Sequence, residues 1–186
     1  MKRYLFFVIL FLVSGHNIVF CQNQDFYCGK TIVEGENFVY KVVEHRTFIA
    51  LFDTTNVMSQ SKWFLRDGIT YGDSRMAGYI EPEDITAVYN MFKSLFTSNE
   101  ISIIKQGAEG RFCAIDAVLV VDENGKVLEV DYNFPKIPVL TSISPSVFYE
   151  LSEMIKESLT MKYPDYIKKQ CSYVKGVSCY IDLRKL

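Results

Sequence analysis

The sequence predicts an α+β fold: an antiparallel sheet with two main helices packed on one of its faces. This prediction rests on three features. Short runs of β-branched and aromatic residues fill much of residues 28–60 and recur after residue 110. Two longer segments carry apolar residues at intervals of three or four, which is typical of a helix that buries one side. A tight turn joins two of the later strands, which favours antiparallel pairing.

The N-terminal half is predicted to be rich in strands. The strand-like runs cover residues 31–33, 38–43 and 47–52, with polar or glycine-containing turns between them. After these runs the pattern is lost, because residues 53–60 are polar and the next stretch holds three glycines. The fold of residues 53–80 is therefore left undetermined.

Two helices are expected, at about residues 82–96 and 145–162. Ile85, Val88 and Phe92 mark the apolar side of the first, which Pro82 can begin. Residues 101–104 read either as a short strand or as a continuation of this helix. Ser144 can cap the second helix with Pro145 in its first turn, and Pro164 follows its end.

A hairpin is predicted at residues 111–132, because Asn124-Gly125 lies between two strand-like runs and both residues tolerate positive φ. A last strand is expected at about residues 174–183, where apolar and polar residues alternate. The C-terminal part is thus a strand, a hairpin, a second strand, a helix and a final strand. Helices on one side of an antiparallel sheet suit this order.

The first 21 residues read as a signal peptide. Lys2 and Arg3 precede ten apolar residues, and cleavage after Cys21 would make Gln22 the first mature residue. The apolar run is short for a membrane-spanning helix. An uncleaved anchor and lipidation at Cys21 are the alternatives. We expect residues 22–186 to form a single exported domain without a membrane span.

Composition excludes several classes of function. The 186 residues are 23% charged and 49% apolar, as in ordinary globular proteins. Removing Lys2 and Arg3 with the leader shifts the formal net charge from −2 to −4, and no basic run remains, which argues against nucleic-acid binding. No phosphate-binding glycine motif occurs, so we predict no cofactor. We also predict no metal site, because His45 is the one histidine after the leader and no zinc-binding spacing is present.

The mature chain keeps an even number of cysteines. In an oxidising compartment they could form up to two disulfides, with three pairings that sequence does not separate. Cys113 and Cys179 lie on alternating apolar stretches that can face one core, and a Cys171–Cys179 bridge is another option. Buried thiols are the alternative. The disulfide candidates are Cys28, Cys113, Cys171 and Cys179.

No catalytic constellation is recognised, and we predict no catalytic residue. Asp116 is the one carboxylate inside an apolar strand pattern, and its parity predicts an outward, solvated side chain. A hydrolase would have to use Asp116 with Asp131 and Glu129, or a Cys28/His45 pair. Five aromatic residues in less periodic settings are candidates for contact with a glycan or peptide: Trp63, Tyr71, Tyr79, Tyr132 and Tyr173.

Residues 110–186 resemble the C-terminal domain of TonB-type proteins. The resemblance lies in Val-Asp-Glu-Asn-Gly-Lys-Val at residues 121–127, with residues 144–163 matching the family's helix and residues 177–183 its closing strand. It implies periplasmic recognition of an extended peptide by strand addition at a sheet edge. The chain departs from that family in having no Pro-rich spacer and a β-rich N-terminal half. As a whole it is similar to small secreted proteins of unknown function in gut Bacteroidetes.

Together these observations predict an exported, non-enzymatic interaction module of the cell envelope, with an unidentified protein, peptide or glycan partner. A small secreted hydrolase, using carboxylates or a Cys/His pair, is the alternative. A structural envelope component or a secreted inhibitor is a third, which the sequence does not separate from the first.

Overall fold

The computed structural model describes residues 24–61, 82–110, 113–162 and 171–186. The predicted leader, its cleavage site at Cys21 and the aromatic candidates Trp63, Tyr71 and Tyr79 lie outside these residues. No helix within the described ranges is long and apolar enough to cross a membrane.

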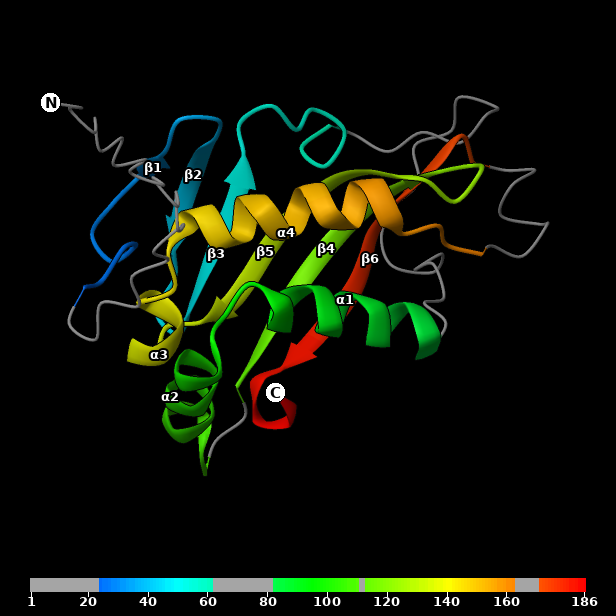
Figure 1. The fold of residues 1–186 in the computed structure, drawn as a ribbon. Helices are drawn as coiled ribbons and strands as arrows, with labels where there is room; N and C mark the ends of the chain where they lie inside the picture. Colours follow the sequence, from blue (N-terminus) through cyan, green and yellow to red (C-terminus); the bar gives the residue numbers. More distant parts are fainter. Residues whose placement is uncertain (1–23, 62–81, 111–112, 163–170) are drawn as a thin grey trace, which may run out of the picture.

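One antiparallel sheet of six strands forms the centre of the fold (Figure 1). The strands are β1 (Ile32–Glu34), β2 (Val39–Glu44), β3 (Phe48–Asp53), β4 (Ala114–Asp122), β5 (Val127–Pro135) and β6 (Tyr173–Asp182). Their order across the sheet is β1-β2-β3-β5-β4-β6. The β4–β5 hairpin therefore joins the N-terminal strands through β5, and β6 adds to the other side of β4.

Two helices, α1 (Pro82–Ser94) and α4 (Pro145–Ser158), cover one face of this sheet (Figure 1). Ser144 caps α4 and Pro145 occupies its first turn. The shorter elements α2 (Ser98–Ala108), α3 (Pro138–Thr141) and η1 (Leu183–Lys185) lie together at one end of the sheet. This arrangement confirms the predicted α+β class with its two main helices on one face.

Aromatic rings dominate the core between α4 and the sheet. Phe148 of α4 stacks on Phe134 of β5 with ring centroids 5.2 Å apart, and it also contacts Tyr27 and Tyr132. Tyr27, Tyr132 and Phe148 are fully buried. The Tyr27 hydroxyl donates to the carbonyl oxygen of Ile143 at 2.7 Å, which ties the segment before β1 to the start of α4. These contacts fix the N-terminal strands against α4.

The first predicted helix ends earlier than expected. α1 stops at Ser94, and a separate helix, α2, begins at Ser98. Thr97 and Glu100 form a capping box that satisfies the first backbone N–H groups of α2. The region expected to be a short strand or a continued helix is thus a helix of its own.

The second predicted helix is also shorter than expected. It ends at Ser158, well before Pro164. Beyond it, Thr160 pairs with Lys126, and the Met161 N–H donates to the Gly125 carbonyl oxygen at 2.7 Å. These bonds to the β4–β5 turn draw the chain out of the helix.

Candidate functional site

The face of the sheet opposite α1 and α4, called here the outer face, carries several exposed apolar side chains. Side chains alternate along a strand, and the pairing register places Ile32, Val39, Phe48 and Tyr180 on this face. All four are among the exposed large apolar residues, with Tyr180 58% exposed. The outer face therefore offers apolar surface where a one-sided antiparallel sheet normally presents polar side chains.

Part of the outer face is covered by the segment after β3, residues 54–61. The Glu129 carboxylate of β5 accepts three consecutive backbone N–H bonds, from residues 57, 58 and 59, at 2.7–2.8 Å. The Lys175 ammonium of β6 donates to the carbonyl oxygens of residues 58, 59 and 61, at 2.6–3.1 Å. Glu129 of β5 thus binds N–H groups of this segment and Lys175 of β6 binds its carbonyl oxygens. Together the two side chains hold the segment's backbone against the sheet.

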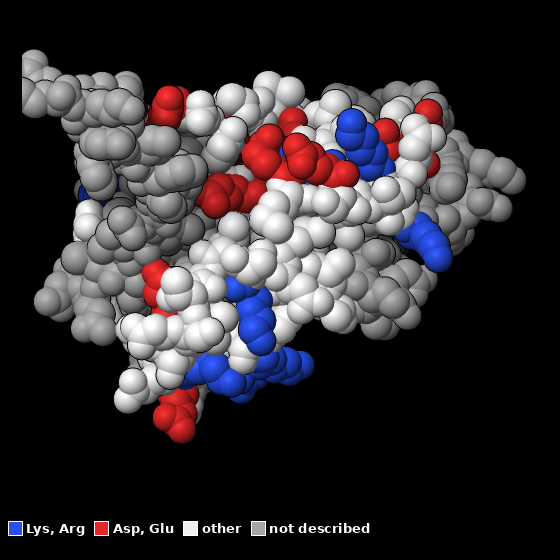
Figure 2. All heavy atoms as spheres, viewed as in Figure 1, with Lys and Arg blue, Asp and Glu red and all other residues white. Residues whose placement is uncertain are grey.

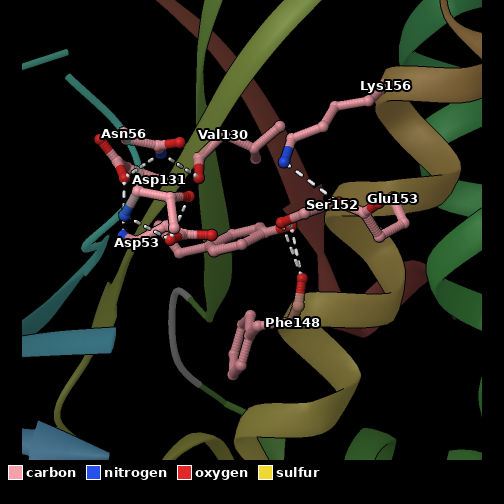
Figure 3. Close-up of polar contacts among 10 residues, drawn as sticks. Asp53, Asn56, Val130, Asp131, Phe148, Ser152, Glu153 and Lys156 are labelled. Atoms are coloured by element: carbon pink, nitrogen blue, oxygen red, sulfur yellow. Dashed lines mark hydrogen bonds and ion pairs between the residues drawn. The ribbon is translucent and has the colours of Figure 1, made fainter. Parts of the chain in front are cut away.

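Asp131 anchors the start of the same segment (Figure 3). Its Oδ1 accepts a bond from the Asn56 side chain at 2.8 Å and from the Asp53 backbone N–H at 3.1 Å. Asn56 also donates to the Val130 carbonyl oxygen, so β3, β5 and the segment meet at one buried point. Burial raises the pKa of Asp131, and the bond from Asn56 is among the hydrogen bonds that oppose this rise.

Asp116 of β4 also lies on the outer face. It is paired with Asn133 on β5 and with Tyr180 on β6. Its Oδ2 accepts a bond from Ser178 at 3.3 Å, whereas its Oδ1 is buried without a hydrogen-bond partner among the described residues. Burial raises the pKa of Asp116. The side chain points outward, as predicted, but it is half-buried rather than fully solvated.

The three carboxylates considered for a hydrolase serve different purposes in this arrangement. Both oxygens of Glu129 are occupied by backbone N–H groups, and Oδ1 of Asp131 accepts two bonds. Fixed, hydrogen-bonded carboxylates of this kind hold a loop in place. Within the described part of the chain, Asp116 keeps an oxygen without a donor, whereas Asp131, its diagonal neighbour on the outer face, is already hydrogen-bonded to Asn56 and to the Asp53 backbone.

In the proposed Cys28/His45 pair, the surroundings of Cys28 disfavour the thiolate that would act as the nucleophile. Burial raises the pKa of the Cys28 thiol to about 11, and the nearby Asp25 carboxylate adds to the rise. Catalytic cysteines need the opposite shift, because the thiolate is the nucleophile. His45 stacks its ring on Phe48 with centroids 4.0 Å apart.

No disulfide joins the four cysteines within the described ranges, and Cys113, Cys171 and Cys179 are buried thiols. The register explains why the two proposed pairings do not form. Cys179 lies opposite Ala117, so Cys113 is four residues away along β4, about 13 Å. Cys171 precedes β6 and is farther still from Cys179 along that strand. A disulfide needs Cα atoms within about 7 Å.

Two of the five aromatic candidates, Tyr132 and Tyr173, lie within the described residues, and both pack against the core. Tyr132 is a core residue, because its parity on β5 turns the ring toward α4, where its hydroxyl meets Ser152 at 2.8 Å. Tyr132 is therefore not available to a ligand. Tyr173 is half-buried against the core. Tyr180 of β6, which was not among the predicted candidates, is exposed, and its position on the polar side of the alternating pattern could have indicated this.

No cluster of three or more His, Cys, Asp or Glu side chains that could hold a metal ion occurs in the parts of the chain that the structure describes.

A cavity of about 790 Å³ lies beside the edge strand β1 and is called here the β1 groove. Side chains of both parities of β1, Ile32 and Val33, line it, so the cavity follows the outer edge of the strand. The first turn of α4 forms the opposite wall with Ser144 and Ser146. Figure 1 shows β1 at the margin of the sheet near the start of α4.

Aromatic side chains line the interior of the β1 groove. Phe38, directly before β2, stacks on Tyr149 of α4 with ring centroids 5.5 Å apart, and Phe26 lies half-buried in the wall. The backbone N–H of Phe26 donates to the Thr141 carbonyl oxygen, which fixes the segment before β1. The groove is thus built from segments that are distant in sequence, and its shape depends on the whole sheet.

The backbone pattern shows which groups β1 presents to the groove. The Thr31 carbonyl oxygen accepts from the Val42 N–H, and the Gly35 N–H donates to the Phe38 carbonyl oxygen. Bonded pairs alternate in an antiparallel ladder, so residues 31, 33 and 35 face β2. Ile32 and Glu34 therefore direct their N–H and C=O groups outward. Within the described residues, β1 pairs with β2 and with no second strand.

Comparison with known proteins gives information about the fold. No family model and no curated protein matches the sequence. Among solved structures, a DUF5043 family protein from Bacteroides uniformis is similar, with a TM-score of 0.67 and 21% sequence identity over 86% of this chain and 89% of that chain. At this identity the similarity is one of fold. The chain shares its architecture with that Bacteroides protein.

Proposed function

We propose that the protein is an exported, non-enzymatic interaction module of the cell envelope that binds an extended polypeptide in the β1 groove. The observation that carries the proposal is the outward-facing edge of β1 beside a cavity of about 790 Å³. An extended chain seated there adds a strand to the sheet. It exchanges backbone hydrogen bonds with Ile32 and Glu34.

Side-chain contacts supply the specificity of this binding mode. In strand addition, main-chain bonds contribute much of the affinity, and pockets beside the edge select alternate side chains of the ligand. The stacked Phe38 and Tyr149 rings offer a rigid aromatic surface for one apolar side chain. Exposed edge strands are otherwise protected in most proteins, because they invite pairing with other chains.

The C-terminal topology also supports a peptide-binding role. β4, β5, α4 and β6 follow one another as the strand, hairpin, strand, helix and strand of the TonB-type resemblance. That resemblance implies recognition of extended peptides by strand addition. The predicted signal peptide at residues 1–21 supports export.

A variant of the β1 edge tests the proposal. Ile32→Pro removes one outward N–H without disturbing the bonds from β1 to β2, since residue 32 faces away from β2. Ile32→Val keeps the N–H and serves as the matched control. Peptides selected from a random displayed library on the mature protein should bind the control and lose about tenfold or more in affinity for Ile32→Pro. A library without binders, or binders that are indifferent to Ile32→Pro, would contradict the proposal.

A further inference from the structure

The rim of the β1 groove is acidic. Its lining contains the carboxylates of Glu34, Glu36 and Glu150 and a single ammonium, that of Lys30. None of these four charges has an ion-pair partner among the residues that the structure describes. The groove therefore presents a net excess of two negative charges that internal ion pairs do not neutralise.

Beyond the groove, acidic and basic side chains both lie along α4. Figure 2 shows Asp and Glu side chains gathered over α4, with basic side chains beyond them at its far end and at the end of the molecule that holds α2 and η1. α4 contributes Glu150 at the groove; in its next turns Glu153 pairs with Lys156 at 3.1 Å, and Glu157 follows. The charge that selects a ligand is therefore that of the rim, and the rest of α4 lies outside it.

The N-terminus of α4 does not offset this charge with free donors. The Ser144 hydroxyl oxygen accepts the N–H of Ser146, and the Ser144 carbonyl oxygen accepts the N–H of Val147. An anionic ligand would therefore face the groove's carboxylates while the first amides of the helix are already bonded. The electrostatics of the groove favour a cation.

We infer that the occupant of the β1 groove is a cationic extended segment, with an apolar side chain for the Phe38–Tyr149 pair and Lys or Arg at neighbouring positions. This inference rests on the proposed function, because it names the chemistry of the peptide that adds to β1. The backbone of the segment bonds to the strand edge. Its basic side chains pair with Glu34, Glu36 and Glu150 at the rim.

Two synthetic peptides of equal length test the charge preference. One repeats Val-Lys-Lys and the other Val-Glu-Glu, so that charged side chains project to both faces of the added strand, and fluorescence anisotropy measures the affinity of each for the mature protein. We expect the lysine peptide to bind about tenfold more tightly at low salt, as three exposed ion pairs would give. The preference should weaken as salt is raised, because the rim charges are exposed.

Variants that replace glutamates by glutamine test whether the rim carboxylates cause the preference for the lysine peptide. Combining Glu34→Gln, Glu36→Gln and Glu150→Gln should abolish it, whereas combining Glu109→Gln, Glu153→Gln and Glu157→Gln makes the same change in charge outside the lining and should largely keep it. Equal binding of the two peptides, or a preference that survives the groove variant, would overturn the inference. If both peptides bind equally and Ile32→Pro abolishes both, the proposed function stands and the cationic occupant is wrong. If neither peptide binds, the cationic occupant is wrong; a library that also yields no binder removes the proposed function as well.

Discussion

Asp116 is held in an unfavourable setting on the outer face, since burial raises its pKa and Oδ1 has no donor among the described residues. We expect Asp116→Asn to raise the free energy of unfolding at pH 7 by on the order of 1 kcal/mol, because a neutral amide avoids the desolvation of a charge. Protonation of Asp116 relieves the same penalty in the wild type. The stability that Asp116→Asn gains over the wild type should therefore shrink as the pH falls through the raised pKa of Asp116. Urea denaturation at neutral and acidic pH measures both effects.

Asp182 provides a control of opposite sign. The hydrogen bonds from Arg184 lower the pKa of Asp182. Asp182→Asn should destabilise the protein at neutral pH, and this loss should shrink as the pH falls through the lowered pKa. An Asp116→Asn variant that is less stable than the wild type at pH 7 would show that the Asp116 carboxylate has a stabilising partner.

Gly125 in the β4–β5 turn is required by two features at once. Its φ is +88°, and a Cβ atom there would lie 1.9 Å from the carbonyl oxygen of Met161. Gly176 has a φ of +75°, and a Cβ atom added there would have no neighbour within 4 Å, so Gly176→Ala measures backbone strain alone. We expect Gly125→Ala to destabilise the protein by about 1–3 kcal/mol more than Gly176→Ala, as overpacking typically does. Equal losses in thermal or urea unfolding would contradict the close approach of Met161.

At the scale of elements, Glu129 of β5 and Lys175 of β6 hold the segment of residues 54–61 against the sheet. Glu129→Gln removes the charge and replaces one of the two accepting oxygens with a donor. We expect a loss of about 2–3 kcal/mol, the range for bonds to a buried charged group. Amide hydrogen exchange at residues 57–59 should accelerate, whereas Glu157→Gln, on the exposed side of α4, should leave it unchanged. Unaltered protection of these amides in Glu129→Gln would contradict the anchoring role.

The elements that could be predicted are those with local signals. β-Branched and aromatic residues marked β2 and β3, alternation marked β6, and the Asn124-Gly125 turn marked the β4–β5 hairpin. α2 was missed because its apolar residues are few, although the capping box of Thr97 and Glu100 stands in the sequence. The burial of Glu129 could not be foreseen, since it arises from a segment whose pattern is not periodic.

The complete fold, rather than any local pattern, creates the candidate site. The β1 groove joins Ile32 and Phe38 to Tyr149, residues far apart in the sequence that no local pattern brings together. The sequence did provide a general expectation of peptide binding at a sheet edge. It did not indicate which edge, because the sheet order that leaves β1 at the margin is set by the pairing of β3 with β5.

The proposed function requires an extended peptide to pair with the outer edge of β1, and amide hydrogen exchange of Ile32 and Glu34 tests this pairing. In the protein alone, both amides should exchange quickly, while the amide of Val33, which faces β2, is protected. Saturation with a bound peptide should slow exchange at Ile32 and Glu34. If both amides still exchange quickly at saturation, the peptide does not add a strand to β1, and the proposed binding mode is wrong.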